Sequence, residues 1–414
     1  LRLNFPSPNG NADRALAGDL WIKSGATLQM SSTVNNKLTV GRDFTLDGTF
    51  LMPPAVGGDI YIGRNWNRAA AGIFTHNDRA VFMNTNQDGT ITANGNGQYF
   101  PYLYITKTAA ADSIRLRDSI AIGKEMSVTA GTFDLAAKDA VLLSNATETA
   151  RFGTVGGSGD VAYSGVGRFI VERYIPTGTG LGQHGKTWQF LSVPTNGGQT
   201  IRQAWQEGAS TPNQNNKPGY GTMITGNMTN ATSLGFDVAT AQSAGPGMKV
   251  FNSAGNNWTG VPNTSSTALH NAKGYMIFVR GDRSVTTFSG PTSVPVPTNM
   301  RSRGKLFVPV SNPAPVTTVS AGSFESIGNP LASAVDFTLL SKPIPANLDE
   351  AYYVWDPLLP GPRWGLGGYQ LIASSNAYKP SPGGTANYSN AVPYTKIQSG
   401  QAFMVHATGA GGNV

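Results

Sequence analysis

The feature that most constrains the fold is a weak repeat in the first part of the chain. An apolar–polar–apolar triplet is followed by Gly and a basic residue, and a Gly-x-Phe phrase comes a few residues later. The two closest glycines, Gly41 and Gly63, lie 22 residues apart, and Gly123 follows 60 residues after Gly63, close to three further copies. The three copies of the triplet and its basic residue are 38–42, 60–64 and 120–124.

A repeat of this length predicts a β-solenoid, because each copy can form one coil of short strands that is buried only by stacking on its neighbours. We expect a right-handed, parallel β-helix-like domain over residues 1–165. Val40 and Ile62 should then share one interior column, and Phe44 and Trp66 should lie on one sheet. Glycine at each corner suits a positive φ. An ordinary β-meander is the alternative.

The composition of the sequence changes near residue 166, where aromatic residues and Pro- and Asn-rich loops appear. Two segments repeat one order of features: a strand ending at Pro194 or Pro330, a short apolar-spaced stretch, and a final Gly-led apolar run. Proline ends a strand because it has no N–H for the ladder. The sequence therefore predicts two tandem β-sandwich-like modules, 166–300 and 301–414, in an all-β protein.

Composition narrows the function classes. Charged residues make up only 13% of the chain, beside 51 Gly and 26 Pro, which favours short strands over long helices. The net charge of +7 comes from scattered single residues, so we expect no nucleic-acid partner. No apolar run reaches the ~20 residues of a membrane-spanning helix, so we expect no transmembrane segment. The absence of Cys excludes disulfides and thiolate chemistry.

Catalytic signatures are weak. The four histidines are far apart in the sequence, and neither an HExxH motif nor a Gly-x-Ser-x-Gly elbow occurs. Solenoid coils could bring Glu125 near Glu148 as a glycosidase pair, but a solvated surface explains both residues more simply. The sequence thus predicts a protein that is not an enzyme and has no cofactor, apart from the calcium ion considered next.

A calcium loop is the one metal motif. Asn84, Asn86 and Asp88 offer oxygens at alternating positions before Gly89, as calcium loops do. The first position is Asn rather than Asp, and the twelfth is Gly95, which cannot supply a carboxylate. A polar turn between two strands accounts for the same residues.

Exposed aromatic residues could stack on sugar rings. Trp355, Trp364 and Tyr369 lie near a Pro- and Gly-rich loop and are the candidates for glycan stacking, with packing in a core as the alternative. The integrin-type tripeptide at Arg280, Gly281 and Asp282 follows an apolar strand, where Gly-Asp favours a turn.

Several short sequence segments resemble segments of the large surface and secreted proteins that gliding Bacteroidota export through the type IX secretion system. The solenoid phrases at 102–107 and 131–135 are similar to their coils. The later phrases at 327–330, 335–337, 353–357 and 397–403 are similar to their recurrent module. The resemblance implies O-glycosylation at an Asp-Ser/Thr-apolar pattern, which Ser113 and Ser119 both fit. It also implies the type IX secretion machinery as a partner.

The sequence therefore predicts a non-catalytic extracellular or outer-surface protein with a structural or adhesive role. Its expected partners beyond the secretion machinery are polysaccharide or other surface proteins. Two alternatives stay open: a carbohydrate-binding accessory region of a larger secreted enzyme, and a self-assembling filament subunit. Strand pairing between copies would build the filament.

Overall fold

The computed structural model describes residues 13–30, 36–95, 98–237, 245–270, 272–286, 294–309, 311–340, 347–359, 366–409 and 411–414. The chain forms two compact units. The first unit is Leu1–Ile170 with Val308–Pro313, and the second is Val171–Phe307 with Ala314–Val414. The protein is all-β, with 44% of residues in strands and 4% in helices.

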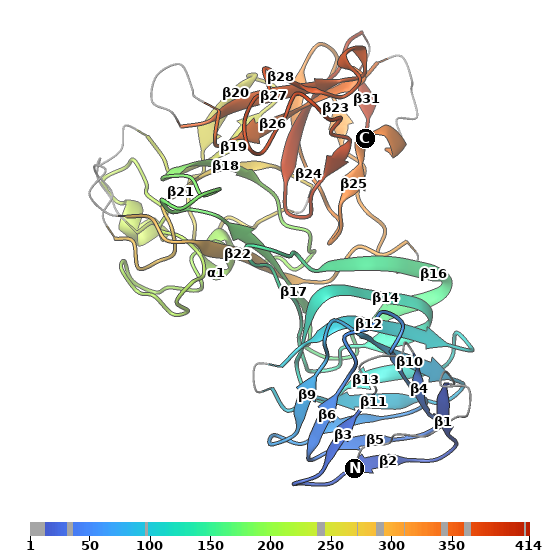
Figure 1. Cartoon of the computed structure of the whole chain (residues 1–414). Helices are drawn as coiled ribbons and strands as arrows, with labels where there is room; N and C mark the ends of the chain where they lie inside the picture. The colour runs from blue at the N-terminus through green and yellow to red at the C-terminus, as the bar shows by residue number, and fades with distance from the viewer. Residues whose placement is uncertain are drawn as a thin grey trace. The chain divides into compact units, whose positions relative to one another are not determined.

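The first unit is a β-solenoid of about six turns, as the repeat predicts (Figure 1). Its strands stack in parallel on three faces. The first face holds β1(Arg14–Leu16), β4(Leu38–Val40), β7(Ile60–Ile62), β10(Ala80–Thr85), β12(Phe100–Lys107) and β14(Ile120–Asp134). The second holds β2(Leu20–Ile22), β5(Phe44–Leu46), β8(Trp66–Arg68), β11(Gly89–Thr92) and β13(Ser113–Leu116), which also pairs with β14. The third holds β3(Thr27–Gln29), β6(Thr49–Leu51) and β9(Ile73–Thr75), and β15(Ala140–Leu142) and β16(Arg151–Ala162) follow β14.

Interior columns run along the stack. Val40 pairs with Ile62 and Phe44 pairs with Trp66, and all four side chains are buried, so both predictions are confirmed. The first column continues through Met83, Ile105 and Val128. Because strand residues alternate between faces, the apolar–polar–apolar triplets place two side chains of each strand inside.

The expectation that positive φ explains the repeat glycines is wrong for Gly41 and Gly63, which have ordinary φ values. Glycine is needed there because the coils approach closely. A Cβ at Gly63 would lie 2.0 Å from the Gly41 carbonyl oxygen, and one at Gly41 would lie 2.5 Å from the Ala17 oxygen. Among the glycines of the repeat, only Gly131, with a φ of 83°, has the positive φ that we expected.

In the described part of the second unit, the two larger sheets are antiparallel. The first sheet is ordered β18(Thr187–Leu191), β21(Tyr275–Val279), β19(Met248–Asn252) and β20(Asn257–Gly260). The second is ordered β24(Phe324–Gly328), β30(Ala402–His406), β26(Ala351–Asp356), β27(Gly368–Ala373) and β28(Pro380–Ser381). Smaller pairs are β17(Phe169–Ile175) with β22(Thr298–Gly304), β23(Thr318–Val319) with β31(Gly412–Asn413), and β25(Val335–Asp336) with β29(Lys396–Ile397).

Three apolar clusters of described residues build the interior of this unit. One covers an outer face of the first sheet and includes Leu191 and Tyr275. A second covers an outer face of the second sheet and includes Ile327 and Phe403. The third contains side chains from both sheets, Phe190 and Met276 with Ala402 and Met404, so the two sheets pack on each other through it.

Short helices close the outer clusters. The helix α1(Ile201–Trp205) has a capping box in which Thr200 and Gln203 satisfy each other's backbone N–H groups, and it buries Ile201, Ala204 and Trp205. The helix η2(Phe337–Leu339) buries Phe337, which belongs to the cluster of Ile327 and Phe403. The remaining helices are η1(Ala231–Leu234) and η3(Ser374–Asn376). None of the helices in the described ranges has the length and apolarity that crossing a bilayer requires.

Candidate functional site

A cleft of about 310 Å³ opens in the second unit. Its walls come from β17, β18, the end of β26 and the segment between β28 and β30. We call it the Trp355 cleft and define it by Arg173, His184, Trp355, Tyr388, Lys396 and Gln401, which all line it. Its volume is in the range of small-ligand pockets, and its lining mixes aromatic faces with amide and cationic groups. Such a lining can stack on a ring and orient it through hydrogen bonds.

Trp355 and Tyr369, two of the residues predicted to stack on glycans, face each other on neighbouring strands. Their rings meet edge to face, with centroids 5.0 Å apart. Both also belong to the cluster between the two sheets, and only Trp355 is among the residues lining the cleft. Trp364, the third candidate, lies outside the described residues. Glycan stacking at these residues stays a prediction.

The position of Trp355 depends on Gly367. A Cβ at Gly367 would lie 2.4 Å from the Trp355 Nε1 atom, and the backbone there has a φ of +97°, which side chains rarely adopt. The loop before β27 therefore needs glycine at this point to leave room for the indole.

His184 is a neutral, oriented group in the cleft wall. Its Nδ1 lies 2.9 Å from the Gly185 carbonyl oxygen, which can only accept, so Nδ1 carries the proton. Its Nε2 then accepts from the Gln189 side-chain nitrogen at 3.0 Å. Burial lowers the pKa of His184 below its usual value, which keeps the ring uncharged near neutral pH.

Tyr388 and Gln401 are held together in the lining of the cleft. The Gln401 Nε2 donates to the Tyr388 hydroxyl at 3.1 Å, and the Gln401 Oε1 accepts from the Gln398 backbone N–H at 3.0 Å. Burial raises the pKa of Tyr388 to about 12, so the hydroxyl keeps its proton and can donate into the cleft.

Arg173 is the charged group deepest in the cleft wall. Its Nη1 donates to the Ser399 carbonyl oxygen at 2.9 Å, whereas its Nε is buried without a hydrogen-bond partner. Burial lowers the pKa of this guanidinium. Sequence analysis missed Arg173, although a Glu-Arg pair inside the apolar strand 169–175 was a signal that charged side chains are buried there.

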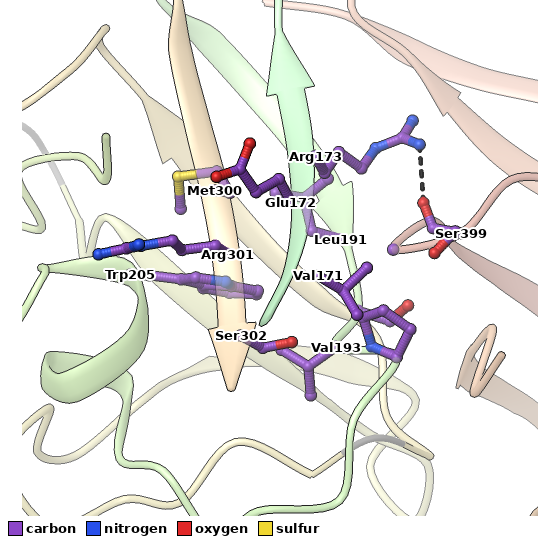
Figure 2. A pocket seen from close by; sticks show the side chains of 13 residues that line it. Val171, Glu172, Arg173, Leu191, Val193, Trp205, Met300, Arg301, Ser302 and Ser399 are labelled. Carbon is purple, nitrogen blue, oxygen red and sulfur yellow. Dashed lines mark hydrogen bonds between the residues drawn. The ribbon is translucent and has the colours of Figure 1, made fainter. Parts of the chain in front are cut away.

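Two other hollows fit a ligand less well. One lies behind Arg173, and Figure 2 shows its lining. It measures about 10 Å³, room for one water at most. The other is an apolar hollow of about 220 Å³ beside Ile327 and Phe403, with few polar groups to orient a ligand.

The predicted calcium residues lie at a solenoid corner. The Asp88 carboxylate accepts from both the backbone N–H and the hydroxyl of Ser113 in the next coil, at 2.7 and 2.9 Å. Asn65 makes the same contacts with Thr90 one coil earlier, so a link between coils accounts for Asp88 without a metal. Asn84 lies in β10, and Asn86 is exposed in the turn after it. Calcium binding stays a prediction.

The two predicted glycosylation sites differ in exposure. Ser113 is half-buried in β13, with its hydroxyl donating to Asp88. Ser119 is exposed, and its hydroxyl accepts from the Asp139 backbone N–H at 3.0 Å. Of the two, Ser119 is the more accessible to a modifying enzyme. Both remain predictions.

The integrin-type tripeptide is not a surface motif in this protein. Arg280 and Asp282 are 2% and 5% exposed, and Asp282 accepts from the backbone N–H groups of Gly219 and Ser284. The chain bends and turns at 281–284, directly after β21, as the turn interpretation predicts. Across the described part of the chain, no group of three or more His, Asp or Glu side chains is arranged to hold a metal ion.

Comparisons with protein-family models, with curated proteins and with solved structures find no match to this chain.

Proposed function

We propose that this chain is a non-catalytic, adhesive protein of the bacterial outer surface, whose second unit binds carbohydrate in the Trp355 cleft. The observation that carries the proposal is the lining of that cleft. Aromatic side chains stand beside amide groups of fixed orientation, which is the combination that sugar rings need for stacking and for hydroxyl recognition.

The chemistry of the cleft favours binding over hydrolysis. His184 already has a partner on each ring nitrogen, and the charged side chains among the described lining residues are the cations Arg173 and Lys396. A glycosidase works with two carboxyl groups that flank the bond to be cleaved. The alternative of an accessory region in a larger secreted enzyme uses this same cleft in the same way.

The solenoid supports the surface location in this proposal. A repeated coil that contacts only its neighbours can be stacked many times into a rigid domain, which suits a structural surface protein. The phrases that resemble type IX secretion cargo lie in both units. On this proposal the secretion machinery exports the chain, and surface polysaccharide or another surface protein is its target.

The second unit is proposed to consist of two copies of one sandwich-like module, 166–300 and 301–414. Among the strands of each sheet, taken in chain order, the first pairs with the last, the last pairs with the second, and the second pairs with the third; the second sheet has β28 as an additional edge strand. Each segment also has its own outer cluster. The contacts between segments are reciprocal: Ser192 N–H donates to Gly400 O, and Gly328 N–H donates to Ala272 O.

Reciprocal contacts of this kind are what an internal two-fold relation produces, as in an isologous dimer. An experimental structure tests the relation. When Leu191 is superposed on Ile327, Tyr275 should fall on Phe403 and Met276 on Met404. A superposition that puts Tyr275 on the other face of β30 would contradict the duplication.

A glycan array with the whole chain tests the binding proposal. We expect binding to a defined set of glycans, and a roughly tenfold loss of affinity in Trp355→Ala, the size expected for a lost aromatic contact. Because Trp355 also packs between the sheets, Gln398→Ala, at an exposed lining residue, is the second variant. Trp21→Ala, at a 58% exposed solenoid residue, is the matched control. Binding that survives in both cleft variants would contradict the proposal.

A further inference from the structure

Arg173 is a half-buried cation without a counter-ion among the described residues. Its side chain leaves β17 toward Ser399, and its hydrogen bond there goes to a neutral carbonyl oxygen (Figure 2). Its Nε atom is buried and unpartnered. Among the described residues, none of the ion pairs includes Arg173, in contrast to Arg283 and Arg301, which each pair with a carboxylate in the same unit.

The adjacent acid does not neutralise it. Glu172 precedes Arg173 on β17, and alternation along a strand sends their side chains to opposite faces. Figure 2 shows the two side chains leaving β17 in different directions. Glu172 is 3% exposed and accepts from the Asn299 side chain at 3.4 Å. The Arg173 charge therefore faces the cleft without an acidic neighbour.

An unpaired guanidinium is costly to keep out of water, and the cost falls when an anion pairs with it. The cleft beside it also holds Lys396, exposed at its rim, so both charges on the described lining are positive. A neutral sugar would leave the Arg173 charge uncompensated. An acidic sugar would supply the counter-ion that Arg173 lacks.

We infer that the Trp355 cleft selects a saccharide that carries a carboxylate, as a uronic acid does, and that Arg173 is the residue that pairs with it. Because Nη1 is engaged with Ser399 and Nε is buried, Nη2 is the donor that remains for the ligand. A carboxylate oxygen can accept from it in a charge-assisted hydrogen bond. Trp355 would stack on the sugar ring, and Tyr388 would donate to a hydroxyl. The inference rests on the carbohydrate-binding function proposed above.

Calorimetric titration of the whole chain tests the inference. The probes are tetragalacturonate, which carries free carboxylates, and the same oligosaccharide fully methyl-esterified, which is neutral. We expect tetragalacturonate to bind roughly tenfold to a hundredfold more tightly, the range for a hydrogen bond to a charged group. Arg173→Gln should abolish the difference, and Arg173→Lys, which keeps the charge but not the planar guanidinium, should reduce it.

Two controls separate this effect from others. Arg117→Gln, at an exposed solenoid residue, removes the same net charge and should leave the preference unchanged. Near-ultraviolet circular dichroism checks that Arg173→Gln is folded. If it is not folded, the comparison of the two probes is made with Arg173→Lys instead. A sulfated disaccharide shows whether another anion replaces the carboxylate, and equal or tighter binding of it would overturn the carboxylate assignment.

The outcomes for the inference and for the proposed function are distinguishable. Equal affinity for the free and esterified probes would overturn the inference and leave carbohydrate binding intact. A preference that persists in Arg173→Gln would overturn the assignment to Arg173. Failure to bind any neutral or acidic glycan would overturn the proposed function, and the inference with it.

Discussion

One ion pair of the solenoid and one of the second unit differ in how far water reaches them. In the solenoid, Arg64 pairs with Asp43 at 2.6 Å across neighbouring coils, and the two side chains stay 33% and 21% exposed. In the second unit, Arg283 pairs with Asp237 at 2.8 Å, and the two side chains are 0% and 2% exposed. The first pair is a corner contact between residues close in sequence, and the second is part of a core.

The difference follows from the thickness of each unit. A solenoid coil is one layer of side chains deep, so polar groups at its corners reach water. In the second unit, Asp237 also accepts from the Gln206 side chain and the Ile224 backbone N–H, both at 2.8 Å, and water cannot replace these partners. The Arg64 pair is thus a surface contact, whereas the Arg283 pair is part of the core.

The largest expected effect is the loss of the buried pair. Arg283→Met should lower the free energy of unfolding by about 3–5 kcal/mol, because it leaves the Asp237 carboxylate buried without its cation. Arg64→Met should cost far less, since Asp43 keeps access to water. Chemical denaturation, followed by tryptophan fluorescence, measures both.

The double variant Arg283→Met with Asp237→Asn sharpens this comparison. Removing the second charge should recover a large part of the loss, because the cost comes from an unpaired charge. A loss in Arg283→Met no greater than that in Arg64→Met would show that the pair contributes no more inside the second unit than on the solenoid.

A smaller effect separates two kinds of glycine. Gly63→Ala should destabilise the solenoid by about 1–3 kcal/mol, because the new methyl group meets the backbone of the preceding coil. Gly322→Ala in the second unit has open space and only a φ of +64°, so we expect about 1 kcal/mol. Gly18→Ala, in open space with an ordinary φ, is the neutral control. Hydrogen exchange of the solenoid amides measures the local loss, and protection unchanged in Gly63→Ala would contradict close coil stacking.

The smallest effect concerns pH. Burial lowers the pKa of His184 in the second unit and of His76 in the solenoid below the ordinary value of 6.5. The unfolded chain therefore binds more protons than the folded chain below pH 6.5, so both histidines reduce stability as the pH falls from there through their folded pKa values. Above pH 6.5 this contribution is constant.

Histidine-to-glutamine variants assign the pH effect to each unit. His184→Gln and His76→Gln should each flatten part of the decline in melting temperature between pH 6.5 and 5. We expect His184→Gln to flatten it more, since His184 is 6% exposed and held at both nitrogens. Parallel curves for the wild type and both variants would contradict the burial effect.

The solenoid was predictable because its contacts recur at the period of its sequence. Val40 meets Ile62, which is one repeat away, so the pattern that defines the repeat also defines the register. The role of the glycines was not predictable to the same degree. Their spacing pointed to corners, but the reason for Gly63, the carbonyl of Gly41 close behind it, exists only once coils are stacked.

Most of the residues that form the candidate cleft could not be predicted from the sequence. Trp355 could be named from its aromatic character, but its neighbours come from distant segments. Arg173 contacts Ser399, which lies 226 residues further along the chain, and no local pattern signals such a contact. His184 stood out only as one of four scattered histidines, and its fixed tautomer depends on the carbonyl and amide placed around it.

The sequence by itself determined the class of the protein. Its low charge, many glycines and 22-residue spacing favour short strands, and they favour stacked coils where the triplets recur. Only the tertiary structure decided which charges are paired and which are not. The free energy of a charge depends on the atoms and water around it, and in the second unit those atoms come from strands far apart in sequence. Arg283 meets a carboxylate there, whereas Arg173 faces an open cleft.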